Sequence, residues 1–293
     1  MLARAESIGV EARRALAENG RGRVAAVFAS SLYVRFGDAW ACLGGRNIGR
    51  GPLNVPCDAV RPKDWREVTA LGSPAVVRGG RLHLSDGFVV LGGAPDWQST
   101  AAPSWTISSL ASGLRALSAA LPADLPKGGL AGFIGPAVSP RTMVEKVAAP
   151  AVEELSRWAA TPPGTGTGCP SGAVSALLGL GPGLTPSGDD FLAGFVVALR
   201  TVRHLSTART LSREISEKAP NLTSDLSAAH LQSAIRAGLN EDMQTLLHAL
   251  LAGRSGAITA GVTKLSAKAH YSSWDMLAGI ATALRKALSH KTA

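Results

Sequence analysis

Residues 179–200 read GLGPGLTPSGDDFLAGFVVALR and join a loop rich in glycine to a strongly apolar segment. The apolar residues after the two aspartates have helical spacing, so we predict a helix over Asp189–Leu205. Glycines permit positive φ angles and let a ligand approach the backbone amides, while two prolines restrict the loop. Amides at the start of a helix form a favourable site for an anion. The stretch therefore predicts an anion-binding loop at a helix N-terminus.

The loop residues that we expect to contact an anionic ligand supply amides, hydroxyls or a carboxylate. They are Gly181, Gly183, Thr185, Ser187, Gly188 and Asp190. The alternative interpretation is a plain Gly/Pro connector followed by an ordinary helix cap. The glycines alone would favour the connector. Their combination with two prolines, two hydroxyls and two adjacent carboxylates favours a binding site.

A second segment repeats the helical part of this stretch. Residues 187–200 read SGDDFLAGFVVALR and residues 272–285 read SSWDMLAGIATALR, at an offset of 85 residues. In each, a serine followed three residues later by an aspartate is typical of a capping box within one helix. Gly194 and Gly279 each cost about 1 kcal/mol relative to alanine in a helix, and a close approach of the two helices would offset this. We therefore expect the helices to pack together with both N-termini on one side. The candidate binding residues of the second segment are Ser272 and Asp275.

The repeat distinguishes the two adjacent aspartates of the first segment. Asp190 has a counterpart in Asp275, and a capping role accounts for both. Asp189 aligns with Trp274, so the repeat gives no structural reason for its carboxylate. Asp189 is therefore our candidate catalytic residue, as a general base or as a ligand of substrate or Mg²⁺, the one cofactor that the residues suggest. A solvated carboxylate in the first helical turn is the alternative.

Two further Gly-rich stretches offer similar chemistry. The loop at Gly44–Pro56 joins predicted strands and places Arg46 and Asn47 among four glycines, where a guanidinium group would bind an anion. A flexible polar connection explains the same residues equally well. The sequence GTGTG at residues 164–168 is a candidate cover for the first loop. The scattered histidines and cysteines predict no metal site.

A β-rich N-terminal part precedes a mainly α-helical part, which predicts an α+β fold with domains at residues 1–104 and 105–293. After a helix near residues 2–18, short strands alternate with glycine turns, as in a small barrel or a curled antiparallel sheet. The expected strands are Arg23–Phe36, Ala39–Leu43, Pro74–Arg78, Arg81–Ser85 and Phe88–Leu91. The other expected helices are Ser108–Ala120, Pro140–Ala159, Gly172–Leu178, Thr207–Lys218, Ser224–Gly238, Glu241–Ala252, Ala257–His270 and Trp274–Ser289.

The composition indicates a large core and a basic surface. The 293 residues are 46% hydrophobic and 17% charged, and a net charge of +9 is spread along the chain. Without a basic run or an aromatic platform, this charge fits the steering of small anions at least as well as the binding of nucleic acid, and a merely basic surface is the simplest explanation. No apolar run approaches the roughly 18 residues that cross a bilayer, and the first residues lack the apolar core of a secretion signal. We therefore predict a cytoplasmic protein that binds neither nucleic acid nor a membrane.

The string GLGPGLTPSGDDFLAG at residues 179–194 resembles the signature of the AllH-type subunits of oxamate carbamoyltransferase, a family long catalogued as a domain of unknown function. Weaker similarities extend over most of the chain. They comprise the strands at Arg23–Phe36, the loop at Gly45–Pro52, the helix at Asn221–Gly238 and the segment Ser272–Gly279, where Ser273-Trp274 replaces a small, Gly-rich pair.

The resemblance implies a subunit of a hetero-oligomeric enzyme of purine and allantoin nitrogen catabolism. That enzyme moves a carbamoyl group between oxamate and phosphate, giving carbamoyl phosphate, so these small anions are the implied ligands. The chain lacks the His-Pro-x-Gln motif of the better-known carbamoyltransferases, and Ser206–Thr210 only approximates their Ser-x-Arg-Thr-Arg loop. Two other functions stay open: a non-catalytic assembly subunit, or a stand-alone enzyme or binding protein for another small anion such as a nucleotide.

Overall fold

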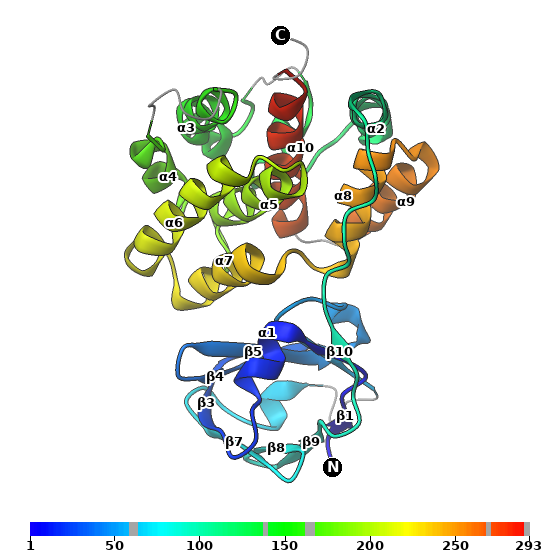
Figure 1. Cartoon of the computed structure of the whole chain (residues 1–293). Coiled ribbons are helices and arrows are strands. Elements are labelled where there is room, and N and C mark those ends of the chain that lie inside the picture. The colour runs from blue at the N-terminus through cyan, green and yellow to red at the C-terminus, as the bar shows by residue number, and fades with distance from the viewer. Residues whose placement is uncertain (59–63, 137–139, 162–167, 268–270, 290–293) are drawn as a thin grey trace. The chain divides into compact units, whose positions relative to one another are not determined.

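The computed structural model describes residues 1–58, 64–136, 140–161, 168–267 and 271–289 (Figure 1). It confirms the predicted α+β fold, because a strand-rich region precedes a helical one. The chain divides into two compact units: Met1–Thr100 with Ala237–Glu241, and Ala101–Arg236 with Asp242–Ala293. The domain limits at residues 104 and 105 stay a prediction. Within the described ranges, no helix has the length and apolar character needed to span a membrane.

The first unit contains an eight-stranded sheet. Its strands are β1 (Ala3–Arg4), β3 (Arg21–Val27), β4 (Ser31–Phe36), β5 (Ala39–Gly45), β6 (Asn54–Cys57), β7 (Pro74–Arg78), β8 (Arg81–Leu84) and β9 (Gly87–Val90). The strand order is β1-β9-β8-β7-β3-β4-β5-β6. The inner pairs are antiparallel, whereas the edge pairs β1–β9 and β5–β6 are parallel. A bridge from Ala5 to Cys57 joins the two edges, so the sheet nearly closes into the predicted small barrel.

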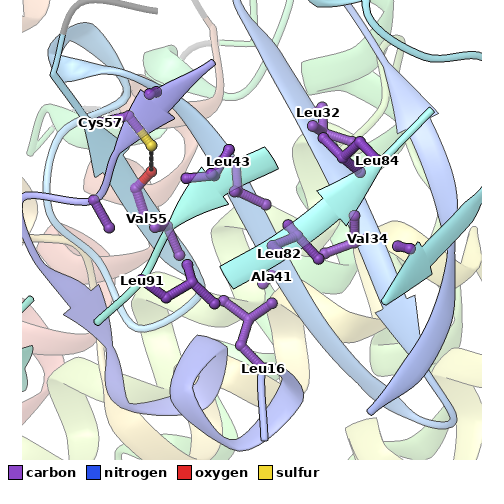
Figure 2. Close-up of a cluster of buried hydrophobic side chains, with 14 of the residues drawn as sticks. Leu16, Leu32, Val34, Ala41, Leu43, Val55, Cys57, Leu82, Leu84 and Leu91 are labelled. Carbon is purple, nitrogen blue, oxygen red and sulfur yellow. Dashed lines mark hydrogen bonds between the residues drawn. The ribbon is translucent and has the colours of Figure 1, made fainter. Parts of the chain in front are cut away.

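The interior of this sheet follows from alternating apolar residues. In β4, Leu32 and Val34 are buried, and in β8, Leu82 and Leu84 are buried, while their neighbours face outward. Figure 2 shows these side chains in one apolar cluster. The remaining short elements of the unit are β2 (Ile8–Gly9), which pairs with β10 (Asp96–Trp97), the helix α1 (Val10–Ala15), and the 3-10 turns η1 (Arg46–Ile48) and η2 (Trp65–Glu67).

Two sequence predictions in this unit are wrong in extent. The predicted strand Arg23–Phe36 is two strands, because the chain reverses at residues 28–30, where the Phe28 amide donates to the Ser31 carbonyl at 2.8 Å. The predicted helix over residues 2–18 is confined to α1, because the residues before it pair as β1 and β2. Sheet pairing thus overrides the helical spacing of a short segment.

The second unit is helical. Its helices are α2 (Ile107–Ala120), α3 (Met143–Ala159), α4 (Ser171–Leu177), α5 (Ser187–Thr201), α6 (Leu205–Leu222), α7 (Asp225–Ala237), α8 (Glu241–Ala252), α9 (Ser255–Ser266) and α10 (Tyr271–Ser289), with a 3-10 turn η3 (Ala131–Ile134). The last three residues of the predicted helix Ala257–His270 lie outside the described ranges. The predicted helix Asp189–Leu205 ends earlier, at Thr201, because Arg203 adopts a φ of 66° and the chain turns into α6.

The helices α5 and α10 lie side by side (Figure 1). A β-carbon at Gly194 would clash with the carbonyl oxygen of Met276, and one at Gly279 would clash with that of Phe191. These two contacts are exchanged by the 85-residue offset of the repeat, so the pair has local twofold pseudosymmetry. The predicted close approach at both glycines is confirmed.

Candidate functional site

The Gly-rich loop, residues 179–186, connects α4 to α5 through backbone conformations that favour glycine. Gly179, Gly181 and Gly183 have φ angles of 74°, 106° and 102°. A side chain at Gly181 would also contact Ser187 closely. The order of the loop thus depends on glycine at several of its positions.

Four backbone amides of this loop, which follow one another except at Pro182, are available to a ligand. The amides concerned belong to Gly181, Gly183, Leu184 and Thr185. Among the described residues, none of these amides has a backbone or side-chain acceptor. The tip of the loop is exposed, with 54% of Leu184 accessible. Unpaired amides in an exposed turn before a helix are donors of the kind that bind small anions.

The start of α5 differs from the predicted capping box. The helix begins at Ser187 itself, its N-cap residue is Pro186, and no side chain caps it. The amides of Asp189 and Asp190 donate to the Pro186 carbonyl at 3.0 and 3.2 Å. The prediction that Ser187 and Asp190 cap their own helix is therefore wrong, because both side chains are engaged across the helix pair.

The serines and aspartates of the repeat pair between the helices. The Ser187 hydroxyl donates to Asp275, and the Ser272 hydroxyl donates to Asp190. Thr185 also bonds to Asp190, and its hydroxyl lies 2.9 Å from that of Ser272. The predicted placement of both helix starts on one side is confirmed. The result is a cluster in which each helix supplies the hydroxyl for the carboxylate of the other.

Asp275 is the better-stabilised acid of this cluster. Its Oδ1 accepts the Leu130 amide at 2.5 Å, and a side chain at Gly129 would clash with the carboxylate. Burial and the nearby charge of Glu145 raise the pKa of Asp275 to about 6, against hydrogen bonds from Leu130 and Ser187 that lower it. The contribution of Gly129 and Leu130 was not predicted from the sequence. The adjacent glycines before a buried apolar run were the available signal.

Asp190 has a less favourable environment for a charge. Only 6% of the residue is accessible, and within the described part of the chain its Oδ2 has no hydrogen-bond partner. Burial raises the pKa of Asp190 well above its ordinary value, and the charges of Asp275 and Asp189 raise it further. Hydrogen bonds from Thr185 and Ser272 only partly oppose this.

Asp189, the candidate catalytic residue, accepts hydrogen bonds at both oxygens. Its Oδ1 receives the Gly179 amide at 2.9 Å, and its Oδ2 receives the hydroxyls of Thr223 and of Ser227, the latter at 2.6 Å. The residue is 2% accessible. These contacts tie the Gly-rich loop to α7, and the catalytic role stays a prediction. Thr223, which follows α6 in an extended conformation, and Ser227 of α7 were not predicted as partners of Asp189.

The remaining predicted residues lie in different surroundings. Gly188 is buried where a side chain would clash with the Leu177 carbonyl of α4, so it serves close packing. Arg46 and Asn47 belong to η1 in the other compact unit, where Arg46 donates to Glu6 at 2.7 Å and lowers the pKa of that carboxyl. Residues 164–167 of the predicted cover lie outside the described ranges. In the described portion of the chain, no three Cys, His, Asp or Glu side chains gather as metal ligands.

The fold and the site define an α+β protein in which two pseudosymmetric helices bring a Gly-rich loop and a hydroxyl–carboxylate cluster together. Residues 177–284 match the family model described as oxamate carbamoyltransferase subunit AllH. The match contains the whole Gly-rich loop, the first copy of the helical repeat and all but the last residue of the second, and it confirms the resemblance predicted from the sequence. No solved structure matches the chain.

Proposed function

We propose that this protein is a subunit of an oxamate-type carbamoyltransferase and that its Gly-rich loop binds an anionic group of the substrate. In the reaction, the carbamoyl carbon exchanges its bond to the oxamate nitrogen for a bond to a phosphate oxygen, giving oxamate and carbamoyl phosphate. Phosphate, oxamate and carbamoyl phosphate are all small anions. The family match supports the reaction class, and the unpaired loop amides support the site.

The observation that carries the proposed site is the set of loop amides without an acceptor among the described residues. A phosphate or carboxylate group would accept hydrogen bonds from the amides of Gly181, Gly183 and Thr185. The hydroxyls of Thr185 and Ser272, 2.9 Å apart, lie at the same helix starts and supply further donors. The positive end of α5 adds to the attraction because its first amides face the loop.

The cluster behind the loop has a supporting role in this proposal. Asp189 is a positioning residue, because its three protein donors fix the loop and leave neither oxygen unengaged. Ser187 and Asp275 hold α5 against α10. Anion binding by Arg46 and Asn47 is a separate proposal. The use of a Mg²⁺ ion as cofactor is another. We also propose a place in purine and allantoin nitrogen catabolism, which the resemblance to the AllH-type subunits implies.

Thermal unfolding of the purified full chain with added anion tests the site. We expect phosphate, oxamate or carbamoyl phosphate to raise the melting temperature, since a ligand of the folded state stabilises it by mass action. Thr185→Val keeps the shape of the side chain and removes the hydroxyl, so it should reduce this shift. Thr263→Val is the matched control, because among the described residues the exposed Thr263 hydroxyl donates only to the Thr259 carbonyl of its own helix, α9.

Reconstitution with the partner subunits tests the reaction. We expect carbamoyl phosphate formation only in the assembled complex, with a lower rate or a higher KM when this chain carries Thr185→Val. Unchanged kinetics in that complex, together with no thermal response to any anion, would show a purely structural subunit. A thermal response to ATP alone would instead indicate a stand-alone nucleotide-binding protein.

A further inference from the structure

The hydroxyls of Thr185 and Ser272, called here the hydroxyl pair, lie between the surface and a buried acid. Both residues are half-buried, and their oxygens are 2.9 Å apart. Both also bond to Asp190, which lies behind them. A hydroxyl has one hydrogen, so each group of the pair either donates inward or presents its hydrogen outward.

The groups around Asp190 disfavour its ionised form. Asp189 precedes it on α5, Asp275 faces it from α10, and Glu145 of α3 acts on Asp275 from behind. All these neighbours are acidic. The Oδ2 of Asp190 has no hydrogen bond from any described residue, although 94% of the residue is buried, since its accessible fraction is 6%. A charged oxygen without a donor is unfavourable in such a place.

We propose that Asp190 acts as a neutral carboxylic acid whose proton turns a hydrogen of the hydroxyl pair outward, toward the anion bound by the Gly-rich loop. The inference rests on the proposed function, because it concerns the same anion. It makes Asp190 a positioning residue, which acts on the ligand through Thr185 and Ser272. No proton is transferred to the substrate.

The hydrogen count explains the effect. With Asp190 ionised, the two hydroxyl hydrogens are used between the hydroxyls and the carboxylate, and the pair presents lone pairs to an incoming anion. With Asp190 protonated, the acid itself supplies one of the internal hydrogen bonds, and one hydroxyl hydrogen is released to the ligand. The neutral acid also removes one negative charge from beside the anion.

Asp275 and Asp190 have different roles in the cluster, because their hydrogen-bond donors differ. Asp275 accepts the Leu130 amide and the Ser187 hydroxyl, so it is the acid better able to carry a charge. The raised pKa of Asp190 agrees with this division, because no backbone amide of the described residues donates to its carboxyl group.

Anion binding as a function of pH tests the inference on the full chain. Oxamate and sulfate are the probes, because both keep a constant charge between pH 5 and 9. We expect the affinity of the wild type to fall as pH rises, by at most about tenfold for each pH unit, since one proton is linked to binding. Asp190→Asn should keep the low-pH affinity at every pH, because its amide donates in place of the acid proton.

Two more variants keep the test decisive. Asp86→Asn, at an exposed position of the first unit, should leave both the affinity and its pH dependence unchanged. Thr185→Val removes half of the hydroxyl pair at a half-buried position, so it should weaken binding and flatten the pH profile even if Asp190→Asn does not fold. A wild-type affinity that is constant with pH, or a wild-type slope in Asp190→Asn, would overturn the inference while leaving the proposed site intact. Failure of the wild type to bind either probe at any pH would overturn both.

Discussion

The N-terminal turns of α5 and α10 carry the same Ser-x-x-Asp pattern, but their surroundings differ. Each serine serves the aspartate of the other helix, as the pseudosymmetry requires. Asp275 gains the Leu130 amide in addition, whereas Asp190 has an oxygen without a partner among the described residues. The shared contacts hold the helices together. The asymmetric ones distinguish an acid that can be charged from one that favours a proton.

The residue before each aspartate marks a second difference. Trp274 and Asp189 are equally buried, at 2% accessibility. Asp189 binds the Gly179 amide and two hydroxyls near the start of α7, so only the α5 copy anchors a loop. Departures from the repeat therefore indicate where a symmetric scaffold has acquired a specialised feature.

The largest expected effect comes from breaking the symmetric contact itself. Gly194→Ala places a methyl group against the Met276 carbonyl, and Gly279→Ala does the same against Phe191. Because backbone on both sides must move, we expect each substitution to lower the free energy of unfolding by about 3 kcal/mol or more. Chemical denaturation monitored by circular dichroism measures this loss.

Gly256→Ala in α9 is the control for helix propensity, because a β-carbon there meets no atom within 4 Å. We expect it to be neutral or slightly stabilising. Equal effects of Gly256→Ala and Gly194→Ala would contradict the close approach of the two helices.

The second effect in size is the pH dependence that Asp275 adds to stability. The ordinary pKa of 3.8 applies to the unfolded chain, and the folded value is about 6. Between these pH values the unfolded chain releases a proton that the folded chain retains, so stability falls as pH rises, by up to about 3 kcal/mol. Above the folded pKa the loss is complete, and below pH 3.8 it is absent.

Asp275→Asn should remove this part of the profile while keeping an oxygen for the Leu130 amide. Unfolding free energies at intervals from pH 4 to 7 measure the slopes of the variant and the wild type. Parallel profiles would show that Asp275 titrates normally and that the two acids are not distinguished as described.

Much of the helical pair could be predicted from the sequence, because a repeat at a fixed offset indicates contacts that both copies share. Gly194 and Gly279 stand at equivalent positions, and this alone indicated that the helices touch. The direction of the serine–aspartate bonds could not be predicted. A serine and an aspartate at this spacing fit a capping box within one helix and hydrogen bonds between two helices equally well. The structure distinguishes the two arrangements because α5 begins at Ser187 and has no side-chain cap.

The hydrogen-bond donors to Asp275 and Asp189 were harder to predict from the sequence. Leu130 gives a backbone amide to Asp275 from 145 positions away, and an amide carries no side-chain signature. Ser227 was hidden within an ordinary helical pattern. In the first unit, the strand pattern located β7 correctly, because alternation and glycine turns act locally, whereas the parallel edge pairs depend on distant partners.

A smaller effect is expected for Asp189, and it sharpens the contrast with its neighbour. Asp189→Asn replaces one acceptor oxygen by an amide donor that faces donors, so we expect a loss of about 2 kcal/mol in unfolding free energy. Asp190→Asn should cost less, since it replaces a carboxyl group whose Oδ2 accepts no hydrogen bond from a described residue. Denaturant titration at pH 7 compares the two variants, and a larger loss in Asp190→Asn would reverse the roles assigned to these carboxyl groups.

The smallest effect is the coupling that tells exchanged pairing from capping within one helix. Ser187→Ala and Asp275→Asn remove the two partners of one bond between helices, so a double-mutant cycle should give a coupling of about 0.5–1 kcal/mol. The corresponding cycle of Ser187→Ala with Asp190→Asn should give a smaller value, because no bond joins these side chains among the described contacts. Unfolding free energies of the single and double variants at one pH supply both cycles. If Ser187 couples more strongly to Asp190 than to Asp275, each serine caps its own helix. The repeated Ser-x-x-Asp pattern would then reflect two separate capping boxes and no hydrogen bond between the helices.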